Sequence, residues 1–170
     1  MIIRGEKLED HTAVRQVNEE AFGSADESDL VDALRKAARP YISLVAEVDG
    51  QVVGHIFFSP VQIESEDSVS TALGLGPMAV LPRFQRQRVG SELIRHGLER
   101  CRKMGHDVVV VVGHPEYYPR FGFVPASRFG LRCEYDVPDD VFMVREMRDG
   151  GLKGVTGTVR YHPVFNRFST

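Results

Sequence analysis

The N-terminal third of the chain begins with a short apolar run typical of a strand. Two stretches with apolar residues every three to four positions follow it. The first stretch follows Asp10, which can cap a helix, and ends at Gly23. The second begins at Asp26 or Ser28, and Pro40 stops it because proline lacks the N–H that a helix needs. This spacing predicts one strand followed by two amphipathic helices.

Apolar and polar residues then alternate in a way that predicts paired strands. Residues 41–48 and 51–58 are joined by Asp49-Gly50, a sequence typical of a type I′ turn, so the two runs are expected to form a hairpin. Ser59-Pro60 is expected to interrupt the second strand, because proline cannot donate to the ladder. A polar, acidic connection then leads to a further strand over residues 69–80.

The next region combines a helix pattern with an unbroken apolar run. Residues 88–104 place small and apolar residues on one stripe, and Gly105 is suited to closing the helix. The five valines at 108–112 suit a strand that is covered on both faces. A strand, a helix and a strand in this order predict a right-handed crossover. Three more strands are expected near residues 131–135, 142–146 and 152–161.

The length and composition of the chain favour one domain that spans residues 1–170. An average apolar content over this length forms one good core and is too little for two ordinary domains. Cys101 and Cys133 do not make a disulfide framework, and the N-terminus lacks the apolar core of a signal peptide. Without a run of about eighteen apolar residues, we expect a cytoplasmic protein with no membrane segment. A formal net charge of −3 gives no general basic surface for nucleic acid.

The turn before the third helix carries an unusual charge pattern. Arg83, Arg86 and Arg88 lie in it, and the first carboxylate after them is Glu92. The positive end of a helix dipole normally favours Asp or Glu in the first turn, so this pattern suggests an anion from outside the chain. Backbone N–H groups at a helix start, with Gly90 allowing close approach, form a phosphate-binding site. On charge alone, a solvated basic helix start explains the pattern equally well.

The same turn resembles a motif of the GNAT superfamily of N-acetyltransferases. The pyrophosphate-binding motif of that family, Gln/Arg-x-x-Gly-x-Gly/Ala, is similar to residues 85–91, which read Gln-Arg-Gln-Arg-Val-Gly-Ser. Arg88 stands where the family motif has its first glycine. A side chain at that position disfavours a backbone with positive φ, whereas an arginine there can add a cation beside the pyrophosphate.

A second segment resembles the GNAT signature Tyr-x-x-x-Gly-Phe. Tyr118, Gly122 and Phe123 match it in register, and Pro119 allows only a short or distorted helix before Gly122. The two signatures occur in the family's order, on either side of the predicted helix–strand crossover. Together they are far more specific than either one alone.

The resemblance covers roughly residues 2–160 and implies the GNAT α+β fold, a mixed twisted sheet of about seven strands flanked by about four helices. It implies acetyl-CoA or coenzyme A as the cofactor and transfer of the acetyl group to a primary amine. In the family, the first helical pair forms part of the acceptor wall, and the strand before the turn pairs with the pantetheine arm. The cofactor-binding residues that the resemblance implies are Met78, Ala79, Val80, Gln85, Arg86, Gln87, Arg88, Val89, Gly90, Ser91 and Tyr118.

Acyl transfer to an amine needs a neutral amine, a stabilised oxyanion and a thiolate that can leave. An alkyl amine with a pKa of about 10.4 is mostly protonated at pH 7, so a base or a water chain should help. The backbone N–H of Ala79 or Val80 is the expected oxyanion donor. Tyr118 is the expected catalytic acid for the sulfur, although packing under a short helix would explain Tyr118 as well as Tyr117. Four residues are possible bases and none is favoured: His55, Glu64, His114 and Glu116.

The acceptor class stays open between small molecules and peptides, because GNAT proteins acetylate many amines within much the same frame. We expect no metal ion, no nucleic-acid partner, and a monomer or a homodimer. The competing hypothesis is a non-catalytic acyl-CoA-binding or sensor module on the same fold. Tyr118 in register favours turnover, whereas Arg88 and the lack of an identified base are compatible with the alternative.

Overall fold

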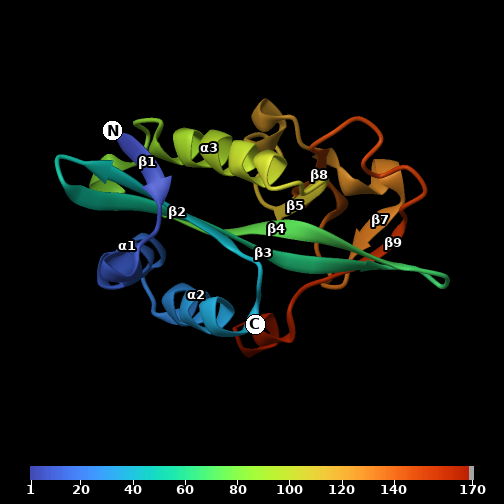
Figure 1. The fold of residues 1–170 in the computed structure, drawn as a ribbon, viewed down its shortest axis with the longest axis horizontal. Coiled ribbons are helices and arrows are strands. Elements are labelled where there is room, and N and C mark those ends of the chain that lie inside the picture. Colours follow the sequence, from blue (N-terminus) through green and yellow to red (C-terminus); the bar gives the residue numbers. More distant parts are fainter. Residues whose placement is uncertain (169–170) are drawn as a thin grey trace. The chain divides into compact units, whose positions relative to one another are not determined.

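The computed structural model describes residues 1–168 and has the α+β architecture expected from the sequence (Figure 1). Within this range there are three α-helices, α1 (His11–Phe22), α2 (Asp26–Ala37) and α3 (Val89–Lys103). The same range contains nine strands: β1 (Ile2–Gly5), β2 (Ile42–Val48), β3 (Gln51–Glu64), β4 (Val69–Val80), β5 (Val108–Val112), β6 (Val124–Pro125), β7 (Leu131–Cys133), β8 (Phe142–Glu146) and β9 (Gly157–Arg160). These counts differ from the expected four helices and seven strands. The short helix expected before Gly122 is a 3₁₀ turn, and strands as short as β6 show no alternation in the sequence. None of the helices in residues 1–168 is long and apolar enough to cross a membrane.

The chain divides into two compact units. The first contains Met1–Ser59, Gly76–Glu99 and the described residues from Pro163 on. The second contains Pro60–Leu75 and Arg100–His162. β3, β4 and α3 therefore each contribute to both units, the basic turn before α3 lies wholly in the first unit, and the second GNAT signature lies in the second.

The predicted hairpin forms the centre of the first unit. β2 pairs with β3 in antiparallel register from Ile42 opposite Phe58 to Val48 opposite Gln51. The turn residue Asp49 has a φ of 50° and the following glycine has a φ of 77°, as a type I′ turn requires. β1 then pairs with the outer edge of β2 in antiparallel fashion. The alternation and the turn sequence thus predicted this hairpin correctly.

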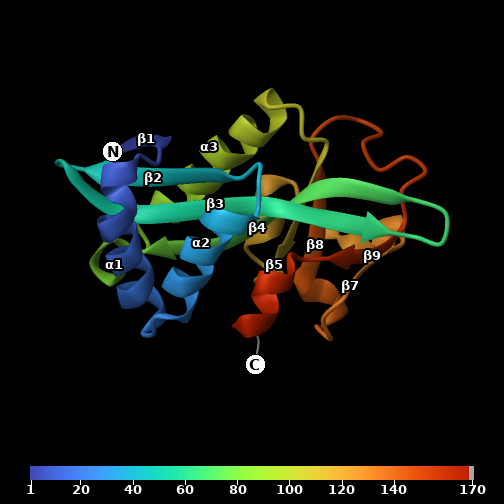
Figure 2. The same cartoon turned by 60° about the horizontal axis from the view of Figure 1, so that its bottom comes forward.

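Helices cover both faces of this part of the sheet, with α1 and α2 on one face and the start of α3 on the other (Figure 1, Figure 2). Adjacent residues of β3 point to opposite faces. Phe57 packs with Leu34 of α2 in a buried apolar cluster. Phe58 lies so close to Gly97 of α3 that a methyl group at position 97 would be 2.5 Å from its ring. A glycine in α3 therefore allows the helix to lie close to β3.

The expected interruption of β3 at Ser59-Pro60 is wrong, because β3 runs without a break from Gln51 to Glu64. The pairing of β3 with β2 ends at Phe58, and its pairing with β9 begins at Gln62. Pro60 lies in the stretch of β3 after its pairing with β2 and before its pairing with β9. Its missing N–H therefore removes no hydrogen bond from either of these two ladders.

Asp10 precedes α1 as expected, but its carboxylate does not cap that helix. A 3₁₀ turn ends at Asp10 and places it in a helical backbone conformation. Its oxygens instead accept hydrogen bonds from the Arg4 guanidinium at 2.7 and 3.0 Å and from the Lys7 backbone N–H at 2.7 Å. The bond from Arg4 is the main reason that the pKa of Asp10 lies below its usual value. Asp10 thus ties the end of β1 to the start of α1.

The second unit contains the parallel strand pair expected from the strand–helix–strand order. β5 pairs in parallel with β4, with Val109 opposite Leu73, and antiparallel with β8. The first four valines of β5 are buried, as expected for a covered strand. α3 ends two residues before Gly105, whose φ is 84°. In the same unit, the end of β3 pairs with β9 in antiparallel fashion, and β9 pairs in parallel with β7.

The last strand is shorter than predicted. β9 spans only Gly157–Arg160, whereas the sequence pattern suggested residues 152–161. Turns occupy the stretch before it, and Gly150 and Gly154 have φ values of 77° and 74° there. These left-handed positions reverse the chain, so that only four residues remain for pairing.

Candidate active site

The turn that precedes α3 places two arginines in left-handed backbone conformations. The φ angle is 62° at Arg86 and 68° at Arg88. Such a conformation costs a residue with a side chain about 1 to 2 kcal/mol. Arg88 nevertheless has the positive φ that a glycine would adopt most easily, so the arginine takes up the glycine-type geometry despite this cost. Backbone strain of this kind is typical of ligand sites.

α3 begins at Val89, directly after the two strained arginines. The backbone N–H of Glu92 donates to the Arg88 carbonyl at 3.0 Å, the first hydrogen bond of the helix. The N–H groups of Val89 and Gly90 therefore have no partner within the helix. Together with the positive end of the helix dipole, these groups make a site suited to an anion.

Packing against β3 fixes the position of this helix start. The Val89 side chain is buried, with only 3% of its surface exposed. A methyl group at Gly54 would lie 2.9 Å from Cγ1 of Val89 and 3.0 Å from Cδ1 of Leu93. A glycine on β3 therefore provides the room that the first turn of α3 fills. The helix start is held by core contacts and needs no ligand to place it.

Two glutamine side chains bond back onto the backbone around the turn. Nε2 of Gln85 donates to the carbonyl oxygen of Val80 at 3.0 Å. Nε2 of Gln87 donates to the carbonyl oxygen of Arg83 at 3.0 Å. The first bond ties the turn to the end of β4, and the second closes the turn on itself. Both bonds stabilise its shape and leave the side chains of Arg86 and Arg88 exposed.

β4 leads directly into this turn. Ala79 is buried, and its neighbours Met78 and Val80 are half-buried. The backbone N–H of Leu81 donates to the Val53 carbonyl of β3 at 2.9 Å, which anchors the end of the strand. The backbone of residues 78–80 is therefore held in strand conformation just before the turn.

Tyr118 opens a 3₁₀ turn, Tyr118–Phe121, which ends at Gly122 with a φ of 87°. This confirms the short helix expected from the proline and glycine. The Tyr118 side chain is buried, and its ring meets the rings of Tyr117 and Phe123 edge-on at centroid distances of 5.3 and 5.7 Å. Burial raises the pKa of the Tyr118 phenol to about 12, with a smaller contribution from Tyr117. The phenol therefore keeps its proton throughout the neutral range.

Comparison with known proteins identifies the family. The sequence matches the acetyltransferase (GNAT) domain over residues 3–126, more than half of the chain. The chain belongs to the GNAT family of acetyltransferases. The uncharacterized N-acetyltransferase YhbS of Escherichia coli K12 is 37% identical over 169 residues, which cover 99% of this chain and 100% of YhbS.

Two solved GNAT structures share the fold closely. The Escherichia coli YhbS structure in complex with CoA has a TM-score of 0.90 at 35% identity. The match covers 99% of this chain and 93% of the YhbS chain. A GNAT acetyltransferase of Brucella melitensis in complex with acetyl-CoA has a TM-score of 0.79 at 38% identity. The match covers 96% of this chain and 97% of the Brucella chain. Both proteins were solved with the type of cofactor that the two sequence signatures imply.

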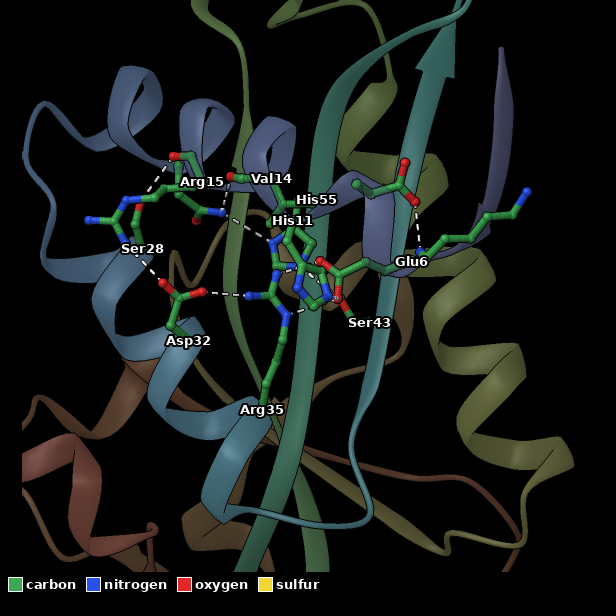
Figure 3. A network of polar contacts seen from close by, with 12 residues as sticks. Glu6, His11, Val14, Arg15, Ser28, Asp32, Arg35, Ser43 and His55 are labelled. Atoms are coloured by element: carbon green, nitrogen blue, oxygen red, sulfur yellow. Dashed lines mark hydrogen bonds and ion pairs between the residues drawn. The ribbon is translucent and has the colours of Figure 1, made fainter.

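His55, one of the four possible bases, is fully buried. It belongs to a network of polar contacts (Figure 3). The Asn18 amide nitrogen donates to the Val14 carbonyl at 3.0 Å and lies 3.2 Å from Nδ1 of His55. Nδ1 of His55 is thus an acceptor. The proton of the neutral ring is therefore assigned to Nε2 of His55, which donates to the Ser43 hydroxyl at 2.9 Å. Burial, with the nearby Arg35 charge, lowers the pKa of His55 to about 3. His55 therefore has neither the access nor the free nitrogen that a base needs.

The other possible bases lie in different surroundings. The Glu64 carboxylate forms an ion pair with Arg160 at 2.5 Å, so this acidic residue has a structural partner. His114 and Glu116 are exposed and lie in the segment that leads to Tyr118. Among residues 1–168, no group of three or more His, Cys, Asp and Glu side chains is placed to hold a metal ion.

The predicted cofactor-binding residues divide between the two units of this GNAT protein. Met78 to Val80 and Gln85 to Ser91 all lie in the first unit, and Tyr118 lies in the second. Sequence analysis missed Gly54, which receives the start of α3. The available signal was an isolated glycine inside a predicted strand, which often marks close approach of another segment.

Proposed function

We propose that this chain acts as a single-domain N-acetyltransferase that moves the acetyl group of acetyl-CoA directly to a primary amine. The observation that carries the proposal is the backbone of Arg88, whose φ of 68° gives a glycine-type turn at the start of α3. A turn of this shape directs backbone N–H groups at a phosphate. The CoA and acetyl-CoA complexes of the two similar proteins support the same cofactor here.

The pyrophosphate of the cofactor binds the turn Gln85–Ser91 in this proposal. The N–H groups of Val89 and Gly90 donate to its oxygens, and the exposed side chains of Arg86 and Arg88 add positive charge beside it. The turn is already shaped by its own hydrogen bonds, so binding requires little reorganisation. The backbone of residues 78–80 pairs with the pantetheine arm.

The reaction is the attack of a neutral amine on the thioester carbonyl. A C–N bond forms, the C–S bond breaks, and the electron pair of that bond leaves on sulfur. The amine releases its extra proton to solvent, and the thiolate takes up a proton, so the products are an N-acetyl amine and CoA. The backbone N–H of Ala79 or Val80 stabilises the oxyanion, and one such donor contributes about 3 kcal/mol.

Direct transfer is favoured over an acetyl-cysteine intermediate by the state of the two cysteines. Cys101 is buried, and burial raises the pKa of its thiol to about 12. Burial also raises the pKa of the Cys133 thiol. A thiol attacks as the thiolate, so neither cysteine is prepared to accept the acetyl group at neutral pH.

Tyr118 assists the departing sulfur. A phenol with a pKa near 12 is a much weaker acid than an ordinary thiol with a pKa of about 8.5. Complete proton transfer from Tyr118 to the thiolate is therefore unfavourable. A hydrogen bond from the hydroxyl to the developing thiolate strengthens as charge builds on sulfur, and it lowers the barrier without a full transfer.

Thiol release from acetyl-CoA over a panel of primary amines tests the proposal. The panel contains diamines, amino sugars, lysine derivatives and peptides with a free N-terminus, and mass spectrometry identifies the N-acetyl product. We expect amine-dependent release together with CoA binding by calorimetry. Binding without turnover on any amine would identify an acyl-CoA-binding module instead. No binding at millimolar CoA would reject the cofactor as well.

A further inference from the structure

The ring of Tyr118 fills a space that exists because residue 113 is a glycine. Gly113 follows β5, and its backbone N–H donates to the Val141 carbonyl at 2.9 Å, which fixes its place beside the start of β8. A methyl group added to Gly113 would lie 2.8 Å from Cδ2 of Tyr118 and closer still to Cε2. Gly113 does not have a positive φ, so its backbone would accept an alanine. The atoms that an added methyl group would meet first belong to the Tyr118 ring.

Arg145 holds the other end of the same 3₁₀ turn. It lies on β8, opposite Val109 of β5, and its Nη1 donates to the carbonyl oxygen of Phe121 at 2.8 Å. Phe121 is the last residue of the turn, where carbonyl groups lack partners within the helix. A methyl group at Gly122 would lie 3.2 Å from Nε of Arg145, so the guanidinium also packs against the glycine that ends the turn.

These two contacts involve different parts of the segment that carries Tyr118, the ring itself and the end of its 3₁₀ turn. Gly113 determines how close the ring can approach the end of β5, and Arg145 determines where the turn carrying the ring is attached to β8. Both strands belong to the buried core of the second unit, in which Val110 and Val144 are fully buried. The ring is therefore placed by rigid elements.

We propose that Gly113 and Arg145 are positioning residues that place the Tyr118 hydroxyl for its hydrogen bond to the departing sulfur. The inference rests on the role proposed above for Tyr118. A hydrogen bond made in the transition state depends steeply on geometry, and a displacement of about 1 Å can cost about 100-fold in rate. Neither residue is required to touch the cofactor, so their loss should reduce kcat and spare CoA affinity.

The first test is Gly113→Ala, assayed with the amine that gives the fastest thiol release in the panel. We expect kcat to fall by about tenfold or more, because the added methyl group displaces the ring, and we expect the Kd for CoA to change less than twofold. The same change in a Tyr118→Phe background should have little further effect on kcat, because the hydroxyl that it displaces is already absent. An equal loss of kcat in both backgrounds would overturn the proposal.

The second test compares Arg145→Met with Arg145→Lys. Methionine removes the donor to the Phe121 carbonyl, whereas lysine retains a donor on a chain of similar length. We expect Arg145→Met to lower kcat several-fold and Arg145→Lys to restore part of the loss, with the Kd for CoA unchanged in both. Arg148→Met is the matched control, because it removes an exposed arginine that pairs with Asp107 at 2.6 Å. A loss that is equal in Arg145→Met and Arg148→Met would indicate a general stability effect and reject positioning.

The Tyr118→Phe variant separates the failure of this inference from the failure of the proposed role of Tyr118. If Tyr118→Phe keeps the wild-type kcat, the hydroxyl has no function and both ideas fail together. If Tyr118→Phe is slow while Gly113→Ala and Arg145→Met are as fast as wild type, Tyr118 assists the reaction but these residues do not position it. Thermal unfolding of each variant verifies that the assays compare folded proteins. If Gly113→Ala does not fold, the Arg145 pair decides the question.

Discussion

Gln85 and Val80 are joined by a hydrogen bond in which the side-chain amide of Gln85 donates to the Val80 carbonyl oxygen at 3.0 Å. This bond links the proposed pyrophosphate turn to the strand end that we propose as the source of the oxyanion donor. A single side chain therefore couples the residues that would bind the cofactor to those that would act on its thioester.

The Gln85 link predicts a difference between two otherwise similar variants. Gln85→Ala should weaken CoA binding about fivefold and also lower kcat, because the loss of one hydrogen bond worth about 1 kcal/mol frees the strand end from the turn. Gln87→Ala removes a bond that stays within the turn, so it should weaken CoA binding and leave kcat unchanged. Calorimetry and steady-state kinetics check both. Identical kinetic effects in the two variants would show that the link to Val80 has no catalytic consequence.

Gly90 should tolerate no large side chain if a phosphate approaches the first turn of α3. Gly90→Val should weaken CoA binding by more than tenfold, because a branched side chain would stand between the backbone and the phosphate. The free energy of unfolding should change by less than about 1 kcal/mol, since glycine itself is unfavourable within a helix. Calorimetry and chemical denaturation measure the two effects separately. Unchanged CoA affinity in a folded Gly90→Val protein would contradict the proposed phosphate site.

Two variants of Arg88 separate the effect of its charge from the effect of its backbone conformation. Arg88→Ala removes the charge and keeps a side chain at positive φ, whereas Arg88→Gly removes both the charge and the strain. We expect both variants to bind CoA up to about fivefold more weakly than wild type at low salt, and the difference to shrink as salt rises, because exposed charges are screened. Binding is measured by calorimetry at several salt concentrations. If Arg88→Gly binds as well as wild type at low salt, the arginine adds nothing to affinity.

Removal of the Tyr118 hydroxyl should slow the chemical step and leave cofactor binding intact. A hydrogen bond to a charged group is worth about 1.5 to 3 kcal/mol, so Tyr118→Phe should lower kcat and kcat/KM together by about 10- to 150-fold. The effect should be constant from pH 6 to pH 9, because the pKa of Tyr118, near 12, lies above this range. Tyr117→Phe is the control and should have a much smaller effect. An undiminished kcat in Tyr118→Phe over this pH range would mean that Tyr118 only packs.

His55 should make the protein less stable in acid. Its pKa is lowered to about 3 in the folded state and is about 6.5 in the unfolded chain. Above pH 6.5 both states are neutral and the free energy of unfolding is unaffected. As the pH falls below 6.5, only the unfolded chain takes up the proton, so the free energy of unfolding should decrease by about 1.4 kcal/mol per pH unit until the pH approaches 3.

Chemical denaturation between pH 7 and pH 5 measures this dependence. His55→Gln, which cannot be protonated, should lose part of the decrease and so show a flatter profile. The variant should be less stable than wild type at pH 7, because the bonds of His55 to Asn18 and Ser43 are disturbed. Parallel pH profiles for wild type and His55→Gln would show that His55 does not control the acid response.

The local features of the fold could be predicted from the sequence because they depend on neighbouring residues. Asp49-Gly50 specifies a type I′ turn by its own backbone preferences, and Gly105 closes α3 for the same reason. The valine run specifies a strand covered on both faces, and the first four of its five valines are buried. The two GNAT signatures are contiguous segments, so the candidate cofactor turn and Tyr118 could also be identified before the structure was known.

The tertiary structure alone decided which distant groups these segments meet. Pro60 lies within β3 where neither the ladder with β2 nor the ladder with β9 reaches, and Asp10 bonds to Arg4 because a 3₁₀ turn directs it away from α1. The positive φ of Arg88 is held by surrounding packing and hydrogen bonds, against its own preference. The placement of Tyr118 depends on Gly113 and on the Arg145 guanidinium from another strand. The bond from Arg145 to Phe121 joins residues that are 24 positions apart, and even the contact of Gly113 with Tyr118 depends on how the chain turns between them, so no local pattern of spacing or charge encodes them.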